Sequence, residues 1–155
     1  MAKTTTDTAS APRSGAGARK GTVARKARAV AGGPQAKLPR LPKAVAGAVR
    51  AARDRKAEDI VVLDLRKAGG FTDYFVICSG TNPRQINAIA DAVDATLRSD
   101  LGERPALAEG TDRSEWILLD YFDFVVHVFS RECRAFYDLE RLWGNAERYA
   151  IADEL

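Results

Sequence analysis

The sequence has very few of the residues that metal centres and redox sites use. One histidine, His127, and two cysteines, Cys78 and Cys133, occur in 155 residues. The cysteines lie in separate apolar segments, without the spacing of a metal-ligand set or a redox pair. We therefore expect two buried thiols in a reducing compartment, and no metal or cofactor.

Long apolar runs are also missing. No run approaches the roughly 18 residues that a membrane span requires, and the N-terminus has no signal-peptide core. We therefore expect a cytoplasmic protein without membrane contact. An organellar location is the alternative, because residues 1–40 are rich in Ala, Thr, Arg and Lys and nearly free of acids, like a transit peptide.

Acidic residues are nearly absent from the first third of the chain. Residues 1–56 contain 14 of the 24 Lys and Arg residues but only two of the 21 acids, so residues 57–155 hold ten basic and 19 acidic residues. A basic arm on an acidic domain favours a polyanion beside the arm and a basic protein surface beside the domain. A solubilising tail and a solvated acidic face would give the same composition.

Residues 1–40 contain almost no large apolar side chains, so they cannot bury enough surface to offset the entropy lost on ordering. We expect them to form a disordered basic tail, and residues 41–155 to form a single domain. A tail of this charge is suited to contact with RNA phosphates. The candidate RNA-contacting residues are Arg19, Lys20, Arg25, Lys26 and Arg28.

Residues 41–155 alternate between helix and strand patterns, which predicts an α/β domain with a mixed five-stranded sheet covered by helices. The expected strands span 59–65, 73–79, 104–109, 115–120 and 124–129, and the expected helices span 43–56, 82–101 and 130–143. Asn82 is expected to cap the second helix, with Gln85 completing a capping box, and Gly102 to end it. Residues expected to face the core include Leu101 of the second helix and Cys133, Phe136, Leu139, Leu142 and Trp143 of the third.

Three groups of residues are candidates for chemistry, and each has a structural alternative. The Ser79–Thr81 turn leads into a helix N-terminus that could hold a phosphate, but it lacks a phosphate-loop glycine pattern and must reverse the chain in any case. Asp120 and Asp123 bracket a turn and could hold a metal, although Asp is an ordinary turn residue. His127 lies among apolar residues without an evident nucleophile, which favours a hydrogen-bonded core residue over a catalyst.

Three blocks follow one another within about residues 41–145: TDYFVICSGTNPRQINAIAD, EWILLDYFDFVVHVF and RAFYDLERLW. Together they resemble the Iojap family, the ribosomal silencing factors, and several blocks in order are more specific than one motif. One position differs, because the family usually has Gly where this chain has Phe122. If this turn needs a positive φ, a Phe there costs about 1–2 kcal/mol.

The resemblance implies a nucleotidyltransferase-like fold without transferase activity. It implies binding to the large ribosomal subunit through ribosomal protein fourteen, a steric block on joining of the small subunit, and repression of translation when nutrients are scarce. It also implies a homodimer when the protein is free.

The resemblance and the residues agree that this is a binding module and not an enzyme. Active nucleotidyltransferases hold Mg²⁺ with paired carboxylates after the Gly-Ser turn, whereas the later strands here read LAEG and WILLD. The alternative is a nucleotidyltransferase-like enzyme or nucleotide-binding protein that uses the Ser79–Thr81 turn.

Strand alternation and the resemblance together select the candidate contact residues. Trp116, Leu118 and Asp120 share one face of their expected strand. Aromatic residues beside acids suit a basic protein partner, because the rings supply buried area and the carboxylates pair with Arg or Lys. The predicted partner-binding residues are Trp116, Asp120, Tyr121, Asp123, Tyr137 and Glu140.

Overall fold

A computed structural model of the protein describes residues 40–110 and 115–152. The predicted basic tail lies outside these residues, apart from Arg40. The elements in chain order are α2 (Lys43–Asp54), β1 (Glu58–Asp64), β2 (Tyr74–Gly80), α3 (Pro83–Leu101), β3 (Leu107–Glu109), β4 (Trp116–Asp120), β5 (Phe124–Ser130), α4 (Arg131–Tyr137), α5 (Leu139–Leu142) and β6 (Glu147–Ala150).

The strands form one mixed sheet in the order β3-β4-β5-β2-β1-β6. Only β2 and β5 are parallel neighbours, and the other pairs are antiparallel. The predicted α/β class is confirmed, with one more strand than expected. The sequence pattern missed β6 because it is a short edge strand with mostly exposed residues, so it shows no apolar alternation.

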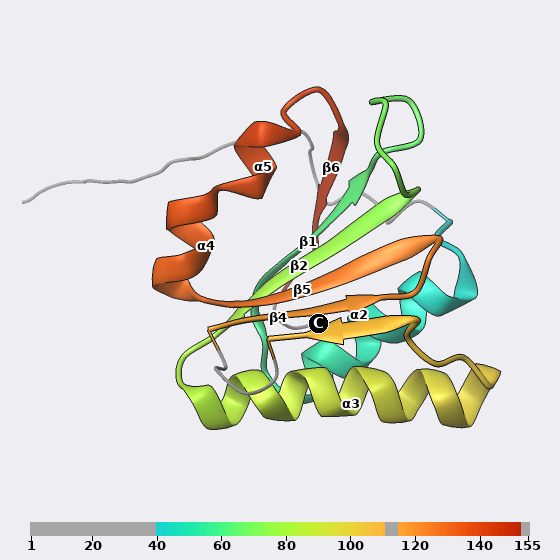
Figure 1. The fold of residues 1–155 in the computed structure, drawn as a ribbon, viewed down its shortest axis with the longest axis vertical. Coiled ribbons are helices and arrows are strands. Elements are labelled where there is room, and N and C mark those ends of the chain that lie inside the picture. The colour runs from blue at the N-terminus through green and yellow to red at the C-terminus, as the bar shows by residue number, and fades with distance from the viewer. Residues whose placement is uncertain (1–39, 111–114, 153–155) are drawn as a thin grey trace, which may run out of the picture. The chain divides into compact units, whose positions relative to one another are not determined.

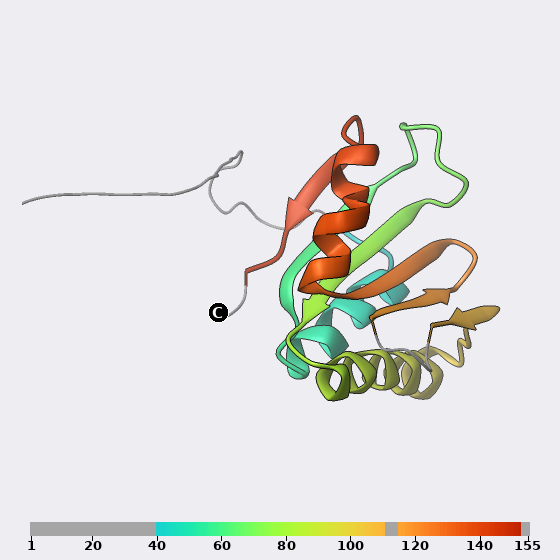
Figure 2. The same cartoon turned by 60° about the vertical axis from the view of Figure 1, so that its left-hand side comes forward.

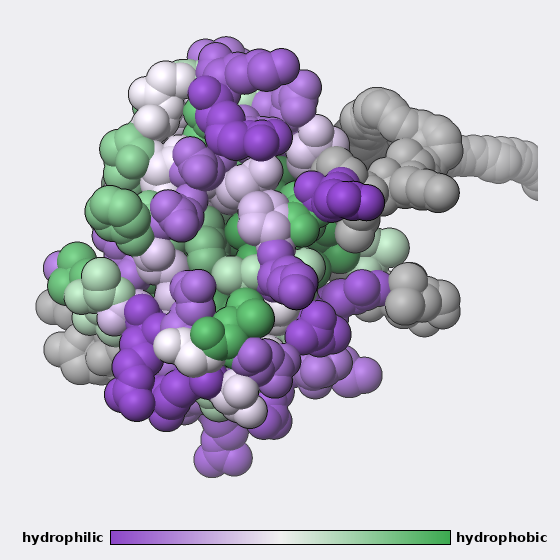
Figure 3. All heavy atoms as spheres, turned by 90° about the vertical axis from the view of Figure 1, so that its right-hand side faces the viewer, coloured by the Kyte–Doolittle hydropathy of each residue, from purple (hydrophilic) through white to green (hydrophobic). Residues whose placement is uncertain are grey.

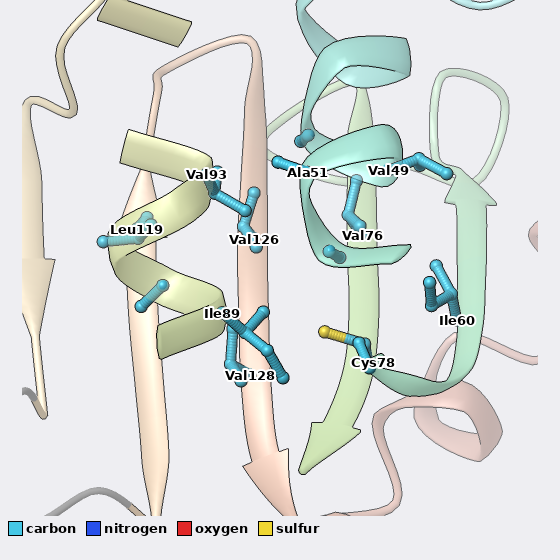
Figure 4. Packing of buried hydrophobic residues seen from close by; sticks show 14 of the residues in the cluster. Val49, Ala51, Ile60, Val76, Cys78, Ile89, Val93, Leu119, Val126 and Val128 are labelled. Atoms are coloured by element: carbon cyan, nitrogen blue, oxygen red, sulfur yellow. The ribbon is translucent and has the colours of Figure 1, made fainter. Parts of the chain in front are cut away.

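One face of the sheet, here called the inner face, is covered by α2 and α3 (Figure 1). Apolar side chains of both helices point toward the central strands, where hydrophobic burial stabilises the domain (Figure 4). The labelled residues of this core are Val49, Ala51, Ile60, Val76, Cys78, Ile89, Val93, Leu119, Val126 and Val128. Burial raises the pKa of the Cys78 thiol to about 12, so it stays protonated at neutral pH.

The expected N-cap of α3 is confirmed, but Gln85 does not complete the predicted capping box, because it accepts the N–H of Thr81 and not that of the N-cap residue Asn82. Asn82 Oδ1 accepts the Gln85 N–H at 2.9 Å, and Gln85 Oε1 accepts the Thr81 N–H at 2.7 Å. Gly102 ends the helix with a φ of 67°. Leu101 is 39% exposed and does not face the core as predicted, because it is the last helical residue, beside the exposed Gly102.

The other face of the sheet, here called the outer face, is covered in part by α4 and α5 (Figure 2). The prediction of one continuous helix over 130–143 is wrong, because Asp138 adopts a φ of 48° between α4 and α5. Phe136 is 80% exposed and Leu142 is 70% exposed, although both were expected in the core. Cys133 is only half-buried, since it lies in the first turn of α4 beside Glu115.

Candidate protein-binding surface

The outer face of β3 and β4 carries a row of half-buried and exposed side chains. Trp116, Leu118 and Asp120 are half-buried on this face, while the intervening Ile117 and Leu119 are buried on the inner face. This alternation agrees with the prediction that Trp116, Leu118 and Asp120 share one face of their strand. The register pairs Leu107 with Asp120 and Glu109 with Leu118, which adds an exposed leucine and an exposed acid to the same face. We call these five residues the β3–β4 face: Leu107, Glu109, Trp116, Leu118 and Asp120.

Trp116 is held by aromatic neighbours. Its ring is stacked on Phe129 of β5 with a centroid distance of 4.9 Å. The ring of Tyr137 in α4 is tilted against it, and the centroids of these two rings are 4.6 Å apart. Its indole Nε1–H donates to Nδ1 of His127 at 3.1 Å. The structure therefore brings together two predicted contact residues, Trp116 and Tyr137, from elements that are separate in sequence.

His127 is a buried, hydrogen-bonded residue, as its apolar neighbours in the sequence predicted. Its side chain is 3% exposed and lies 4.5 Å from the ring of Phe75. Burial lowers the pKa of the His127 imidazole from 6.5 to about 3, so the ring is neutral at physiological pH. Its Nε2 has no hydrogen-bond partner among the residues that the structure describes.

The turn between β4 and β5 is shaped by Asp120. Its Oδ1 accepts the Phe122 N–H at 2.8 Å, which is the local bond that makes Asp a common turn residue. Phe122 has a φ of 79° and is 80% exposed. Thr72, in the β1–β2 turn, donates its hydroxyl to the Phe122 carbonyl at 2.9 Å, so the two turns lie side by side. At this end of the sheet, hydrophobic side chains are exposed among hydrophilic ones (Figure 3).

Phe122→Gly is expected to raise the free energy of unfolding by about 1 kcal/mol. A side chain at positive φ costs about 1–2 kcal/mol, part of which is offset by the greater freedom of Gly in the unfolded chain. Urea unfolding of both proteins measures the difference. Phe122→Ala is the matched control, because it removes the ring but keeps a Cβ at the strained φ. A Gly variant that is no more stable than the Ala variant would show that the turn is not strained.

Two of the predicted contact residues are tied into the domain itself. Tyr121 is 6% exposed on the inner face, where its ring stacks on Phe124 at 4.9 Å. Glu140 accepts two hydrogen bonds from the Arg134 guanidinium, and both side chains of this ion pair are less than one-fifth exposed. The side chains of Tyr121 and Glu140 therefore have structural roles within the domain. Asp123 is exposed in the β4–β5 turn, as expected of a contact residue.

The Ser79–Thr81 turn uses its polar groups within the domain. Ser79 is buried and accepts a hydrogen bond from Arg134 at 3.0 Å, while both the N–H and the hydroxyl of Thr81 donate to Gln85. A Cβ at Gly80 would lie 2.8 Å from Ile86 Cγ1, so close packing of the strand end against α3 accounts for this glycine. Packing and capping thus explain the residues that a phosphate site would use.

Residues 40–110 and 115–152 contain neither a metal-ligand cluster nor a membrane-spanning helix. No three His, Cys, Asp or Glu side chains in these ranges are placed to hold a metal ion. No helix of this described part is both long enough and apolar enough to span a membrane.

Comparison with known proteins identifies the family. Residues 39–155 match the family model described as ribosomal silencing factor during starvation. The chain is 40% identical over 99 residues to the ribosomal silencing factor of Bacillus subtilis, which covers 64% of this chain and 83% of that protein. It is 41% identical over 100 residues to the chloroplastic protein Iojap of Zea mays, covering 63% of this chain and 42% of that protein.

The fold agrees with this assignment. A solved structure of a protein from Chromobacterium violaceum superimposes with a TM-score of 0.63 at 34% identity, covering 66% of this chain and 84% of that one. The match to the family model begins four residues before α2 and runs through to residue 155. The chain therefore belongs to the family of ribosomal silencing factors.

Proposed function

We propose that this protein binds the large ribosomal subunit through ribosomal protein fourteen and so prevents the small subunit from joining. A bound domain acts by occupying space, which lowers translation when nutrients are limiting. It needs no catalysis for this, and we propose that it is not an enzyme and works in the cytoplasm.

The observation that carries this proposal is the β3–β4 face. Trp116 and Tyr137 offer aromatic area that is only partly covered, and aromatic residues dominate the binding energy of many interfaces. Glu109 and Asp120 add negative charge to the same face. A ribosomal protein is basic, so its Arg and Lys side chains are complementary to these carboxylates.

The opposite charges of the domain and the tail favour different partners, a basic protein for the acidic domain and RNA for the basic tail. Phosphates of ribosomal RNA would repel the acidic domain, and residues 1–40, with nine basic residues against Asp7, would offset that repulsion by contacting the RNA. We also propose that the free protein forms a homodimer.

Sedimentation of ribosomal subunits through a sucrose gradient tests the main proposal. Excess protein is expected to co-sediment with large subunits and to reduce the peak of joined ribosomes, because the bound domain occupies the joining face. A version lacking residues 1–40 is expected to bind with a weaker dependence on salt, since fewer counterions are released. The proposal fails if excess full-length protein leaves the joined peak unchanged.

A further inference from the structure

The hydrogen bond between Trp116 and His127 has a consequence for the binding surface. Trp116 lies opposite Phe129 in the register of β4 and β5, and His127 lies opposite Leu118. The two residues are therefore diagonal neighbours on the outer face, within reach of each other because both side chains are long. The contact joins a half-buried ring at the surface to a fully buried one beneath it.

Packing alone does not explain a histidine at position 127. Its ring is surrounded by Phe75, Phe129 and Trp116, so a leucine or phenylalanine would suit the same space. Because Nδ1 accepts a hydrogen bond from the indole N–H, the neutral ring carries its own proton on Nε2, which has no partner among the described residues. A buried unpaired donor destabilises the fold, so this histidine calls for an explanation.

We propose that His127 is a positioning residue of the docking surface, holding the Trp116 ring by accepting its indole N–H. This inference rests on the proposed function. The stack on Phe129 restrains the tilt of the indole, whereas the hydrogen bond fixes its rotation, because the acceptor Nδ1 lies in one direction only. A side chain fixed before binding loses less conformational entropy when a partner covers it.

The same bond limits what Trp116 offers to a partner. The one donor of its indole is already used inside the domain, so the exposed part of this half-buried ring offers a partner apolar surface and not an N–H. Such an apolar surface suits the aliphatic stem of a long basic side chain. Glu109, diagonal to Trp116 through its pairing with Leu118, places a carboxylate nearby. The partner group that fits Trp116 is therefore a Lys or Arg side chain, not a hydrogen-bond acceptor.

Three variants test this role by their affinity for purified large subunits. His127→Leu removes the acceptor and is expected to weaken binding about tenfold, the size of one hydrogen bond that orders a central aromatic residue. His127→Asn keeps an acceptor oxygen near the position of Nδ1 and is expected to bind within about threefold of wild type. Trp116→Ala tests whether the β3–β4 face contributes to large-subunit binding.

The NMR signals of the indole N–H groups report directly on the hydrogen bond to His127, separately from any effect on the stability of the fold. The chain has two tryptophans, and Trp143→Phe assigns the signal of Trp116. That signal is expected to shift upfield and to exchange faster with water in the Leu variant, and to return toward its wild-type position in the Asn variant. If the Leu variant does not fold, Trp116→Phe removes the same hydrogen bond from the other side and is expected to weaken binding to a similar extent.

The outcomes separate the two proposals. If Trp116→Ala weakens binding but His127→Leu does not, the positioning role is wrong and the proposed surface stands. If Trp116→Ala binds large subunits as tightly as wild type, the surface is wrong and the role of His127 falls with it. A loss of binding in the Leu variant that the Asn variant does not restore also contradicts the role, since it would reflect general damage to the sheet.

Discussion

Lowering the pH from 7 to 4 is expected to reduce the free energy of unfolding by about 3 kcal/mol through His127 alone. In the folded protein, burial lowers the pKa of His127 to about 3, against 6.5 in the unfolded chain. Between these values the unfolded chain binds a proton that the folded protein does not, so acid favours unfolding. The stability that His127 contributes is fully present above pH 6.5 and is lost progressively as the pH falls toward 3.

In the described part of the chain, His127 is packed among aromatic and aliphatic side chains. Burial is the only cause of the pKa shift, and the rings packed on it belong to Phe75, Trp116 and Phe129. Its cross-strand neighbours are Leu118 on β4 and Ile77 on β2. Protonation would therefore place an unpaired cation in an apolar layer and would remove the acceptor for the Trp116 N–H.

His127→Leu is the control for this prediction, because leucine does not titrate. Urea unfolding measures the decrease in the free energy of unfolding between pH 7 and pH 4. This decrease should be about 3 kcal/mol smaller in the variant than in the wild type. The comparison is needed because the Arg66 guanidinium holds the pKa of Asp64 below its usual range, and that contribution is also lost in acid. Since His127 is the only histidine, its NMR titration can be followed directly. A folded-state pKa near 6.5 would contradict the prediction.

Local sequence patterns predicted the features that depend on neighbouring residues. Alternation placed Trp116 and Asp120 on the face opposite Ile117, and the Asn82 cap and the Gly102 end of α3 are confirmed. An apolar run around His127 correctly indicated a buried ring. Each of these depends on side-chain period or on backbone bonds within a few residues, which the sequence shows directly.

Features that depend on distant residues were not predictable in the same way. Leu107 and Glu109 join the β3–β4 face only through the register of β3, and no local pattern specifies that register. The break at Asp138 interrupts an otherwise regular helical spacing, because a single residue takes a left-handed conformation. The partner of His127 could not be named either, since the contact crosses between two strands.

The carboxylate of Asp120 can serve two purposes on the β3–β4 face, recognition of the proposed basic partner and shaping of the β4–β5 turn. Asp120 does shape the turn, since its Oδ1 holds the Phe122 N–H. A charge reversal at Asp120 would lose this bond as well as the charge. Asp120→Asn separates the two, because the amide oxygen can still accept the hydrogen bond while the charge is removed.

Asp120→Asn and Asp123→Lys are expected to weaken large-subunit binding while leaving the fold intact. Reversal of a charge opposite a basic partner replaces attraction with repulsion, so Asp123→Lys is expected to cost about 2 kcal/mol or more if the pair is desolvated. Asp120→Asn removes attraction alone and should cost less. Substitutions at exposed turn positions usually change stability by less than about 0.5 kcal/mol, so the melting temperatures should stay close to wild type.

Asp91→Lys is the charge-matched control for Asp123→Lys, since each variant changes the net charge by two units, whereas Asp120→Asn changes it by one. Asp91 is an exposed acid on α3, which covers the inner face, so its reversal changes the net charge equally on the side of the sheet away from the β3–β4 face. Titration of large subunits with all three variants, alongside thermal unfolding, separates local recognition from a general effect of charge. If Asp91→Lys weakens binding as much as Asp123→Lys does, the attraction is only long-range. If the two turn variants melt early while their folded fraction binds normally, the carboxylates act on the fold alone and the β3–β4 face does not use them to hold a basic partner.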